Sequence, residues 1–143
     1  MRLNTKCSIA LHCLVFISEY QHKIKVTSEL LAKSTGCNPA AIRSILNSLQ
    51  KAQIISVVRG IGGAYLNADP CTLTIWDIYY AIEPDGLNHL IGIHPHPSKC
   101  CPVGMHIHEA LKASYQEIGE TVQKAMQEIT LQQVMNTFHQ KSD

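Results

Sequence analysis

A chain of 143 residues with 45% apolar and 16% charged residues has room for one domain with a modest core and an appended helix. No apolar run approaches the length that spans a bilayer, and the start lacks the small-residue cleavage site of a signal peptide, so we expect a cytoplasmic protein with no membrane partner. The net charge of +1 hides an asymmetry, because residues 1–66 carry eight Lys and Arg against two Glu (net +6) and residues 67–143 carry four against nine acidic residues (net −5). Unless this segregation arose by chance, the basic half is expected to meet a polyanion.

The first part of the chain predicts two helices. Apolar residues recur at helical spacing from Lys6 to Tyr20, and residues 24–26 are too short for more than an edge strand. Thr27 or Ser28 can then cap a second helix over Ser28–Ser34 with its hydroxyl group.

A turn and a third helix follow. Gly36 ends the second helix, because glycine accepts the left-handed conformation that closes a helix C-terminus. Asn38 can cap the next helix, and Pro39 at its first position loses no needed hydrogen bond. Apolar residues at helical spacing continue this helix over residues 40–52.

A glycine-rich hairpin comes next. The β-branched run at residues 54–58 can pair with residues 64–66, and the connection between them contains Arg59 and three glycines. A short helix, a turn, a second helix and a glycine-rich hairpin are the order of a winged helix-turn-helix, in which the second helix of the motif enters the DNA major groove.

The residues expected to contact DNA lie at the start of the third helix and at the hairpin tip. Arg43 can donate two hydrogen bonds to guanine, and Arg59 can reach the minor groove or a phosphate. Phosphate contacts are expected from basic residues nearby: Arg2, Lys6, Lys33 and Lys51. Base and phosphate contacts are expected from the helix start: Asn38, Ala40, Ala41, Arg43, Ser44 and Asn47. The alternative is that these positions are only the solvated face of a helix.

The segment after the hairpin contains one short helix and an irregular stretch. Thr72 or Thr74 can cap a helix that runs through Ala81. Residues 83–98 contain three prolines and two glycines and are expected to be irregular.

A long helical pattern ends the chain. It runs from Met105 to about Phe138, with a break near Thr130 that separates a final short helix over Leu131–His139. Its apolar stripe is larger than one small domain can cover, so we expect it to pair with a second copy. The stripe comprises positions 107, 111, 118, 122, 125, 126 and 129.

These elements predict a mainly α-helical fold with a small β-hairpin. We expect three parts: a winged helix-turn-helix domain at 1–82, a sensor or linker loop at 83–104, and a dimerisation helix with a C-terminal tail at 105–143.

The loop before the long helix gathers thiols and imidazoles. His94 and His96 with Cys100 or Cys101 could supply metal ligands, although no spacing matches a zinc finger. A redox role is the sharper hypothesis, because a helix N-terminus lowers the pKa of a thiol and Cys101 directly precedes the long helix. The third alternative is a loop cysteine that only packs.

The sequence also resembles a known family in four segments. Together these look like the Rrf-two (Rrf2) family of bacterial transcriptional regulators: residues 1–6, 41–52, 58–65 and 73–79. The resemblance implies a winged-helix homodimer, joined by its long C-terminal helix, that binds palindromic operator DNA and usually represses transcription. It places the DNA contacts within residues 38–47 and at Arg59.

The resemblance does not extend to the iron–sulfur site that some family members carry. Those members hold a [2Fe–2S] cluster with three spaced cysteines and a histidine in this loop. Here the loop has two adjacent cysteines and no third, so no cofactor is predicted. The Cys101-Pro102-Val103-Gly104 stretch resembles a cluster-free subgroup.

No catalytic arrangement is visible, and we expect the protein not to be an enzyme. The leading hypothesis is a homodimeric repressor that responds to a redox or small-molecule signal through the Cys100/Cys101 loop. The alternatives are a winged-helix protein-interaction module without DNA binding and a metal-sensing regulator.

Overall fold

The computed structural model describes residues 5–60, 62–88 and 90–142. The elements in chain order are α1 (Lys6–Tyr20), α2 (Ser28–Thr35), α3 (Pro39–Lys51), β1 (Ile55–Val58), β2 (Gly63–Leu66), α4 (Ile75–Ile82), α5 (Pro102–Gln127) and α6 (Leu131–Ser142). The predicted fold class, mainly helical with one hairpin, is confirmed. None of the described helices combines the length and apolar character needed to span a membrane.

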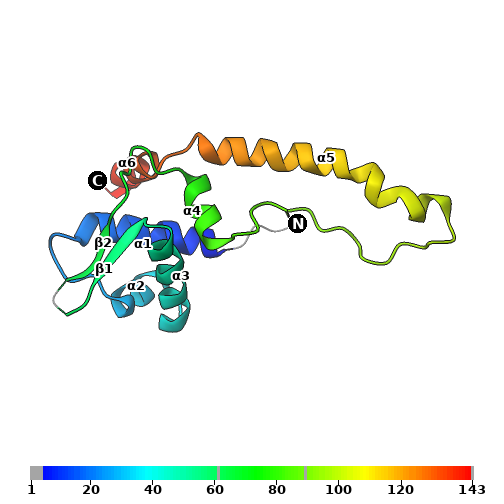
Figure 1. Cartoon of the computed structure of the whole chain (residues 1–143). Helices are drawn as coiled ribbons and strands as arrows, with labels where there is room; N and C mark the ends of the chain where they lie inside the picture. The colour runs from blue at the N-terminus through cyan, green and yellow to red at the C-terminus, as the bar shows by residue number, and fades with distance from the viewer. Residues whose placement is uncertain (1–4, 61, 89, 143) are drawn as a thin grey trace.

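Figure 1 shows two parts of different shape. Helices α1 to α4 and the hairpin form a rounded part, called the head below, with α2 and α3 on one side and α6 on the opposite side. The segment between α4 and α5 runs away from this head, and α5 returns alongside it. The long helix therefore makes an arm that projects from the head.

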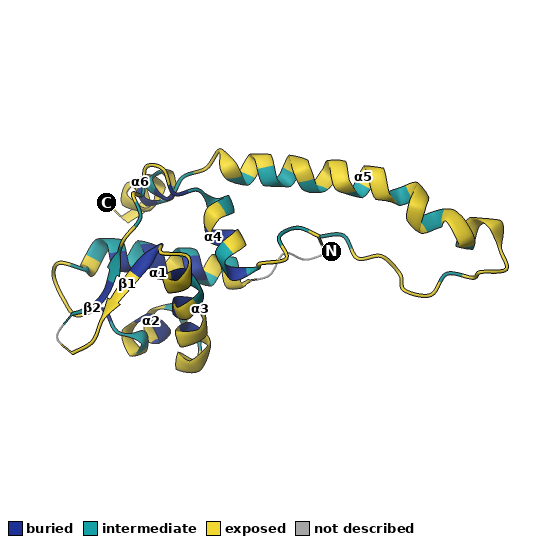
Figure 2. Cartoon of the chain, in the orientation of Figure 1, coloured by how far each residue is buried: buried dark blue, intermediate teal, exposed yellow. Residues whose placement is uncertain are grey.

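The head has one hydrophobic core to which every element except α5 contributes. The fully enclosed side chains include Leu14, Ile17, Leu31, Ile42 and Leu49. These positions follow the helical spacing that the sequence shows, so each helix turns its apolar stripe inward. By contrast, α5 has no buried residue at all (Figure 2).

Local capping explains where α2 and α3 begin and end. The Thr27 hydroxyl accepts a hydrogen bond from the Leu30 N–H, and Gly36 closes α2 with a φ of 72°. The Asn38 side chain accepts a 2.8 Å hydrogen bond from the Ala40 N–H, with Pro39 at the first helical position. The predicted helix-turn-helix is therefore present.

The hairpin is antiparallel, with Ile55 paired with Leu66 at its open end and Val58 paired with Gly63 next to the turn. The segment at 24–26, expected as an edge strand at most, is not a strand. It only accepts one 3.0 Å hydrogen bond, from the Ala64 N–H to the Val26 carbonyl, so it borders the hairpin without extending the sheet.

Of the two threonines that could cap the next helix, Thr74 does so. Its hydroxyl accepts from the Asp77 N–H at 3.1 Å, while the Asp77 carboxylate accepts from the Thr74 N–H at 2.9 Å. This reciprocal pair is a capping box, and it fixes the first turn of α4.

The long helix differs from its expected bounds at the start. It begins at Pro102 rather than Met105, because Pro suits a first helical position and Cys101 is the extended residue before it. The break near Thr130 is confirmed. There the chain pairs with the segment before α4, through hydrogen bonds from Ile75 N–H to Ile129 O and from Leu131 N–H to Leu73 O.

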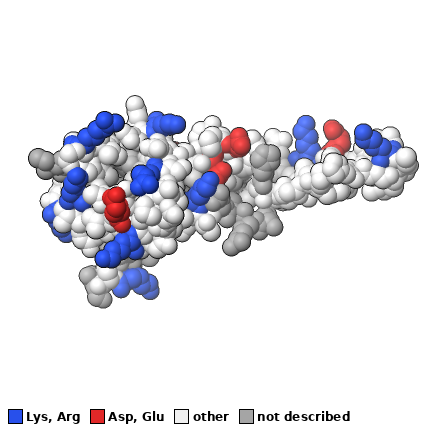
Figure 3. All heavy atoms as spheres, turned by 90° about the horizontal axis from the view of Figure 1, so that it is seen from below, with Lys and Arg blue, Asp and Glu red and all other residues white. Residues whose placement is uncertain are grey.

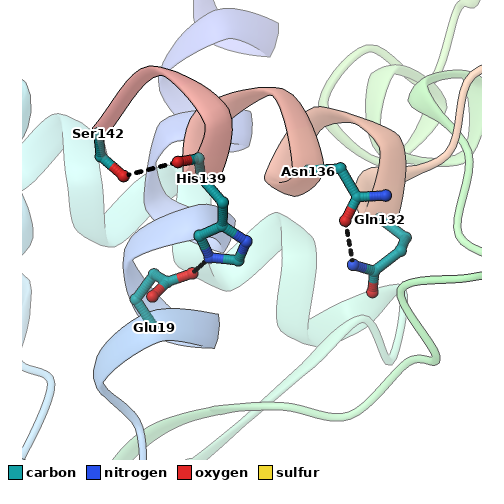
Figure 4. A network of polar contacts seen from close by, with 5 residues as sticks. All are labelled: Glu19, Gln132, Asn136, His139 and Ser142. Carbon is teal, nitrogen blue, oxygen red and sulfur yellow. Dashed lines mark hydrogen bonds and ion pairs between the residues drawn. The ribbon is translucent and has the colours of Figure 1, made fainter.

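Helix α6 then packs back onto the head. It buries Leu131 and Met135 in the core and contacts α1. The Glu19 carboxylate of α1 and the His139 imidazole of α6 also point toward one another and are in contact (Figure 4). The arm is thus tied to the head at the end of α5 that is nearest α4 and α6.

Candidate nucleic-acid interface

A cleft of about 350 Å³ separates α3 from the hairpin. Three of the residues predicted to contact DNA line it together, namely Arg43 and Asn47 of α3 and Arg59 of the hairpin tip. Lys25, from the segment before α2, and Ser28, the first residue of α2, line the same cleft. Two separate parts of the chain thus contribute arginines to one concave surface.

The way α3 packs explains which of its side chains reach the cleft. Its buried stripe consists of Ile42, Ile45, Leu46 and Leu49. Arg43, Asn47 and Gln50 lie at helical spacing on the exposed side, so the burial of the first set presents the second set to solvent.

Figure 3 views the molecule from the side that carries α2 and α3. On the head in this view, Lys and Arg side chains outnumber Asp and Glu. The basic N-terminal half of the sequence therefore supplies a positively charged face around the cleft, as a polyanion-binding surface requires.

The other predicted contacts lie outside the cleft lining. Ala40, Ala41 and Ser44 are exposed on the first turns of α3. Asn38 is also exposed, but its side-chain oxygen is used to cap α3, which leaves its amide N–H groups for an outside acceptor.

The predicted phosphate contacts are scattered around the head. Lys6, Lys33 and Lys51 are exposed, and none of them lines the cleft. Arg2 lies outside the described residues.

The polar cleft residues that the sequence analysis did not predict include Lys25, Ser28, Glu29 and Gln50. Gln50 follows Arg43 by seven residues, so helical spacing could have identified it. Lys25 had no such signal. It reaches the cleft because Gly63 lets the hairpin approach it closely, and a Cβ atom at Gly63 would lie 3.0 Å from the Lys25 Cγ.

The predicted sensor loop places both of its cysteines in solvent, next to the start of α5. The backbone N–H groups of Gly104 and, secondarily, of Val103 lower the pKa of the Cys101 thiol, although the Cys101 side chain accepts no capping hydrogen bond. Gly104 is needed for this geometry, because a Cβ atom there would lie only 2.2 Å from the Ser98 carbonyl oxygen. The Cys-Pro-Val-Gly stretch thus forms a tight N-terminal turn around one thiol.

A hydrogen bond connects this loop to α5 through His94 and His108. The His108 Nε2 atom donates a 2.8 Å hydrogen bond to the His94 carbonyl, which fastens the loop to α5. The described part of the chain contains no group of three or more His, Cys, Asp or Glu side chains that could hold a metal ion. His94, His96, Cys100 and Cys101 are therefore not brought together as a ligand set.

The cysteines of the head are of a different kind. Burial, with a smaller effect of the nearby Cys37, raises the pKa of the Cys13 thiol to about 12. Burial also raises the pKa of Cys7. Cys13 is thus a core residue, whereas Cys7 is only half-buried.

Comparisons with known proteins find similar chains among transcriptional regulators. A family model described as "Rrf2: Iron-dependent Transcriptional regulator" matches residues 3–137. YwnA of Bacillus subtilis (strain 168), described as an HTH-type transcriptional regulator, is 30% identical over 134 residues, which cover 94% of this chain and 97% of YwnA.

Solved structures share the fold along nearly the whole chain. A structure described as a transcriptional regulator from Lactobacillus plantarum has a TM-score of 0.79 at 22% identity and covers 99% of this chain and 100% of its own. Another, described as a DNA-binding protein, has a TM-score of 0.72 at 26% identity and covers 91% of this chain and 98% of its own.

Proposed function

The chain belongs to the Rrf2 family of DNA-binding transcriptional regulators, and from that premise we propose that it is a homodimeric repressor of palindromic operators. The observation that carries the proposal is the cleft in which Arg43, Asn47 and Arg59 meet on a basic face. The family is one of regulators, and the chain is not an enzyme.

The cleft suits duplex DNA in two ways. Arg43, Asn47 and Gln50 run along the exposed side of α3, where a helix in the major groove presents its side chains to base edges. Lys25 and Arg59 flank that helix on the hairpin side, where the phosphate backbone would pass. Base reading and phosphate contact are thereby assigned to different elements.

The uncovered stripe of α5 supports the homodimer. Ile118 is 43% exposed, and Leu111 and Val122 are only half-buried although they lie on one side of a 26-residue helix. A second copy of α5 would cover this stripe and place two heads against two half-sites about 34–36 Å apart, or a multiple of that spacing.

The Cys100/Cys101 loop is the proposed sensor. The pKa of Cys101 is lowered by backbone N–H groups, so at neutral pH its thiolate is more populated than that of an ordinary thiol, and thiolates are the form that oxidants attack. Because the loop is fastened to α5 by His94 and His108, a change there would reach the dimer helix.

A [2Fe–2S] cluster does not fit this loop, although the family description includes iron dependence. Such a cluster needs four protein ligands at separate positions, and the two thiols here are adjacent residues. We therefore propose that this member works without a cluster.

The test is DNA binding by the intact protein across a range of salt concentrations. A duplex is first selected from random sequences with the wild-type protein, and its affinity is then measured for Arg43→Ala/Arg59→Ala. The matched control is Lys112→Ala/Lys141→Ala, which removes the same charge from the arm and tail.

The double cleft variant is expected to lose affinity at least about thirtyfold, since two contacts of at least about 1 kcal/mol each are removed. Its slope of log K against log salt should fall by about 0.9 for each lost phosphate contact. Equal DNA affinity for both double variants would refute the proposal that the cleft binds DNA. Failure to select any duplex would favour the protein-interaction module.

A further inference from the structure

A second groove lies on the opposite side of the head from the DNA-binding cleft. It has a volume of about 450 Å³ and runs between α1 and α6, with the end of α2 at one border. It is lined by Leu11, His12, Val15, Phe16, Glu19, Tyr20, Ser34, Val134 and Phe138. Its volume falls in the range of about 300–1,000 Å³ that small-molecule sites occupy.

The walls of this α1–α6 groove are mainly apolar and aromatic. The Phe16 and Tyr20 rings pack with centroids 4.8 Å apart, and Phe138 faces them from α6. Tyr20 remains 41% exposed and Phe138 44% exposed, although both belong to residue types that fold to bury their rings. The described part of the chain leaves these surfaces without a cover.

The polar groups of the groove are few and placed at its borders. His12 Nε2 and Ser34 Oγ lie 2.9 Å apart and join α1 to α2. The Glu19 carboxylate contacts His139, which joins α1 to α6 (Figure 4). Among the described lining residues, Glu19 is the one carboxylate, and only its Oε1 atom contacts His139, which leaves Oε2 to accept from a ligand.

This combination specifies a ligand class. Apolar aromatic walls remove a hydrophobic body from water, and a carboxylate at the border attracts a cationic head and repels an anionic one. One face of the Tyr20 ring already has a cation over it, since the Lys23 Nζ atom lies 5.8 Å from the ring centroid. We propose that the α1–α6 groove binds a small hydrophobic amine, with its ring between Phe16 and Phe138 and its ammonium group on Glu19.

Such a ligand would contact both the helix-turn-helix and the helix that follows the arm. The groove is shared by α2, which opens the helix-turn-helix, and by α6, which continues from the arm. A ligand that contacts both favours one placement of the head relative to the arm, and a ligand with that preference changes DNA affinity. This regulatory part rests on the proposed function, whereas binding of the amine does not.

The binding test uses three probes with the same apolar body and different heads: 4-phenylbutylamine, 4-phenylbutanol and 4-phenylbutyrate. Titration calorimetry of the full chain without DNA is expected to rank the amine first and the carboxylate last. Glu19→Gln should weaken the amine roughly tenfold, because a hydrogen bond to a charged group is lost, and should leave the alcohol unchanged. Glu117→Gln on α5 is the matched control and should bind like the wild type.

A second variant checks the location of the site. Val134→Phe fills the groove and should weaken the amine and the alcohol alike. No heat of binding for the amine, or equal binding by the amine and the carboxylate, would overturn the proposal. So would an unchanged affinity in Glu19→Gln.

The regulatory part is read separately, from the DNA affinity of wild-type protein with and without saturating amine. Amine binding without any change in DNA affinity would leave the site standing and remove its coupling. Absence of DNA binding in every condition would count against the proposed function and not against the groove.

Discussion

Two glycines of the hairpin offer a controlled test of how the DNA-binding cleft is built. Gly60 and Gly63 both have positive φ, 81° and 79°, so an alanine at either position meets the same unfavourable backbone conformation. Their surroundings differ. A Cβ atom at Gly60 would have no neighbour within 4 Å, whereas at Gly63 it would lie 2.8 Å from the carbonyl oxygen and 2.9 Å from the nitrogen of Val26.

The expected costs follow from this difference. Gly60→Ala should destabilise the protein by about 1–2 kcal/mol, the cost of a left-handed Cβ. Gly63→Ala adds a clash with backbone atoms that cannot rotate away, for which overpacking costs of about 1–3 kcal/mol apply, giving roughly 2–5 kcal/mol in total. Because Gly63 also brings Lys25 to the cleft, this variant should lose DNA affinity as well.

The measurement is urea denaturation of both variants, followed by DNA titration at a temperature where each is folded. A difference of at least about 1 kcal/mol between the two free energies of unfolding is expected. If the two alanine variants unfold at the same urea concentration with the same slope, the contact between the hairpin and Val26 does not hold the wing, and our account of the cleft is wrong.

Three further predictions concern the rest of the fold. Leu131→Ala should destabilise the protein by about 2–5 kcal/mol, measured by urea denaturation, because this fully buried side chain anchors α6 in the core. Thr74→Ala should cost about 1 kcal/mol through loss of the α4 capping box, and Thr72→Ala should cost less in the same assay. Iodoacetamide should alkylate Cys101 in a Cys100→Ser variant with a rate midpoint below the ordinary thiol pKa, because N–H groups stabilise its thiolate. That midpoint should rise when urea unfolds the chain. Equal midpoints in the folded and unfolded states would contradict the last prediction.

The helix-turn-helix could be predicted from the sequence because the residues that cap its helices act locally. Asn38, Pro39 and Gly36 act within one turn of themselves, so their residue types alone locate the ends of two helices. The capping box at Thr74 is also local, yet two threonines were candidates, and the partner Asp77 decides between them by its position three residues later.

The parts that were missed depend on contacts between distant segments. Lys25 enters the DNA-binding cleft through a close approach to the hairpin, which no pattern around residue 25 announces. The α1–α6 groove is lined by residues more than a hundred positions apart, such as Glu19 and Phe138. The sequence analysis placed the start of α5 three residues late, because the first turn of this helix has little apolar periodicity. That turn is defined instead by Pro102 and by the close packing of Gly104 against Ser98.

The arm formed by α5 lacks a core of its own that would stabilise it. Helix α5 buries no residue, and an isolated helix gains little from propensity alone, so its order in solution must come from contacts beyond one chain's core. Its final end is held to the head by the hydrogen bonds around Thr130 and by Leu131, while its first end contacts the preceding loop through His94 and His108 and through the close approach of Gly104 to Ser98. The first end also carries the thiol of lowered pKa, Cys101. If α5 pairs with a second copy, a change at that end alters how the helices pair without disturbing the core of either head.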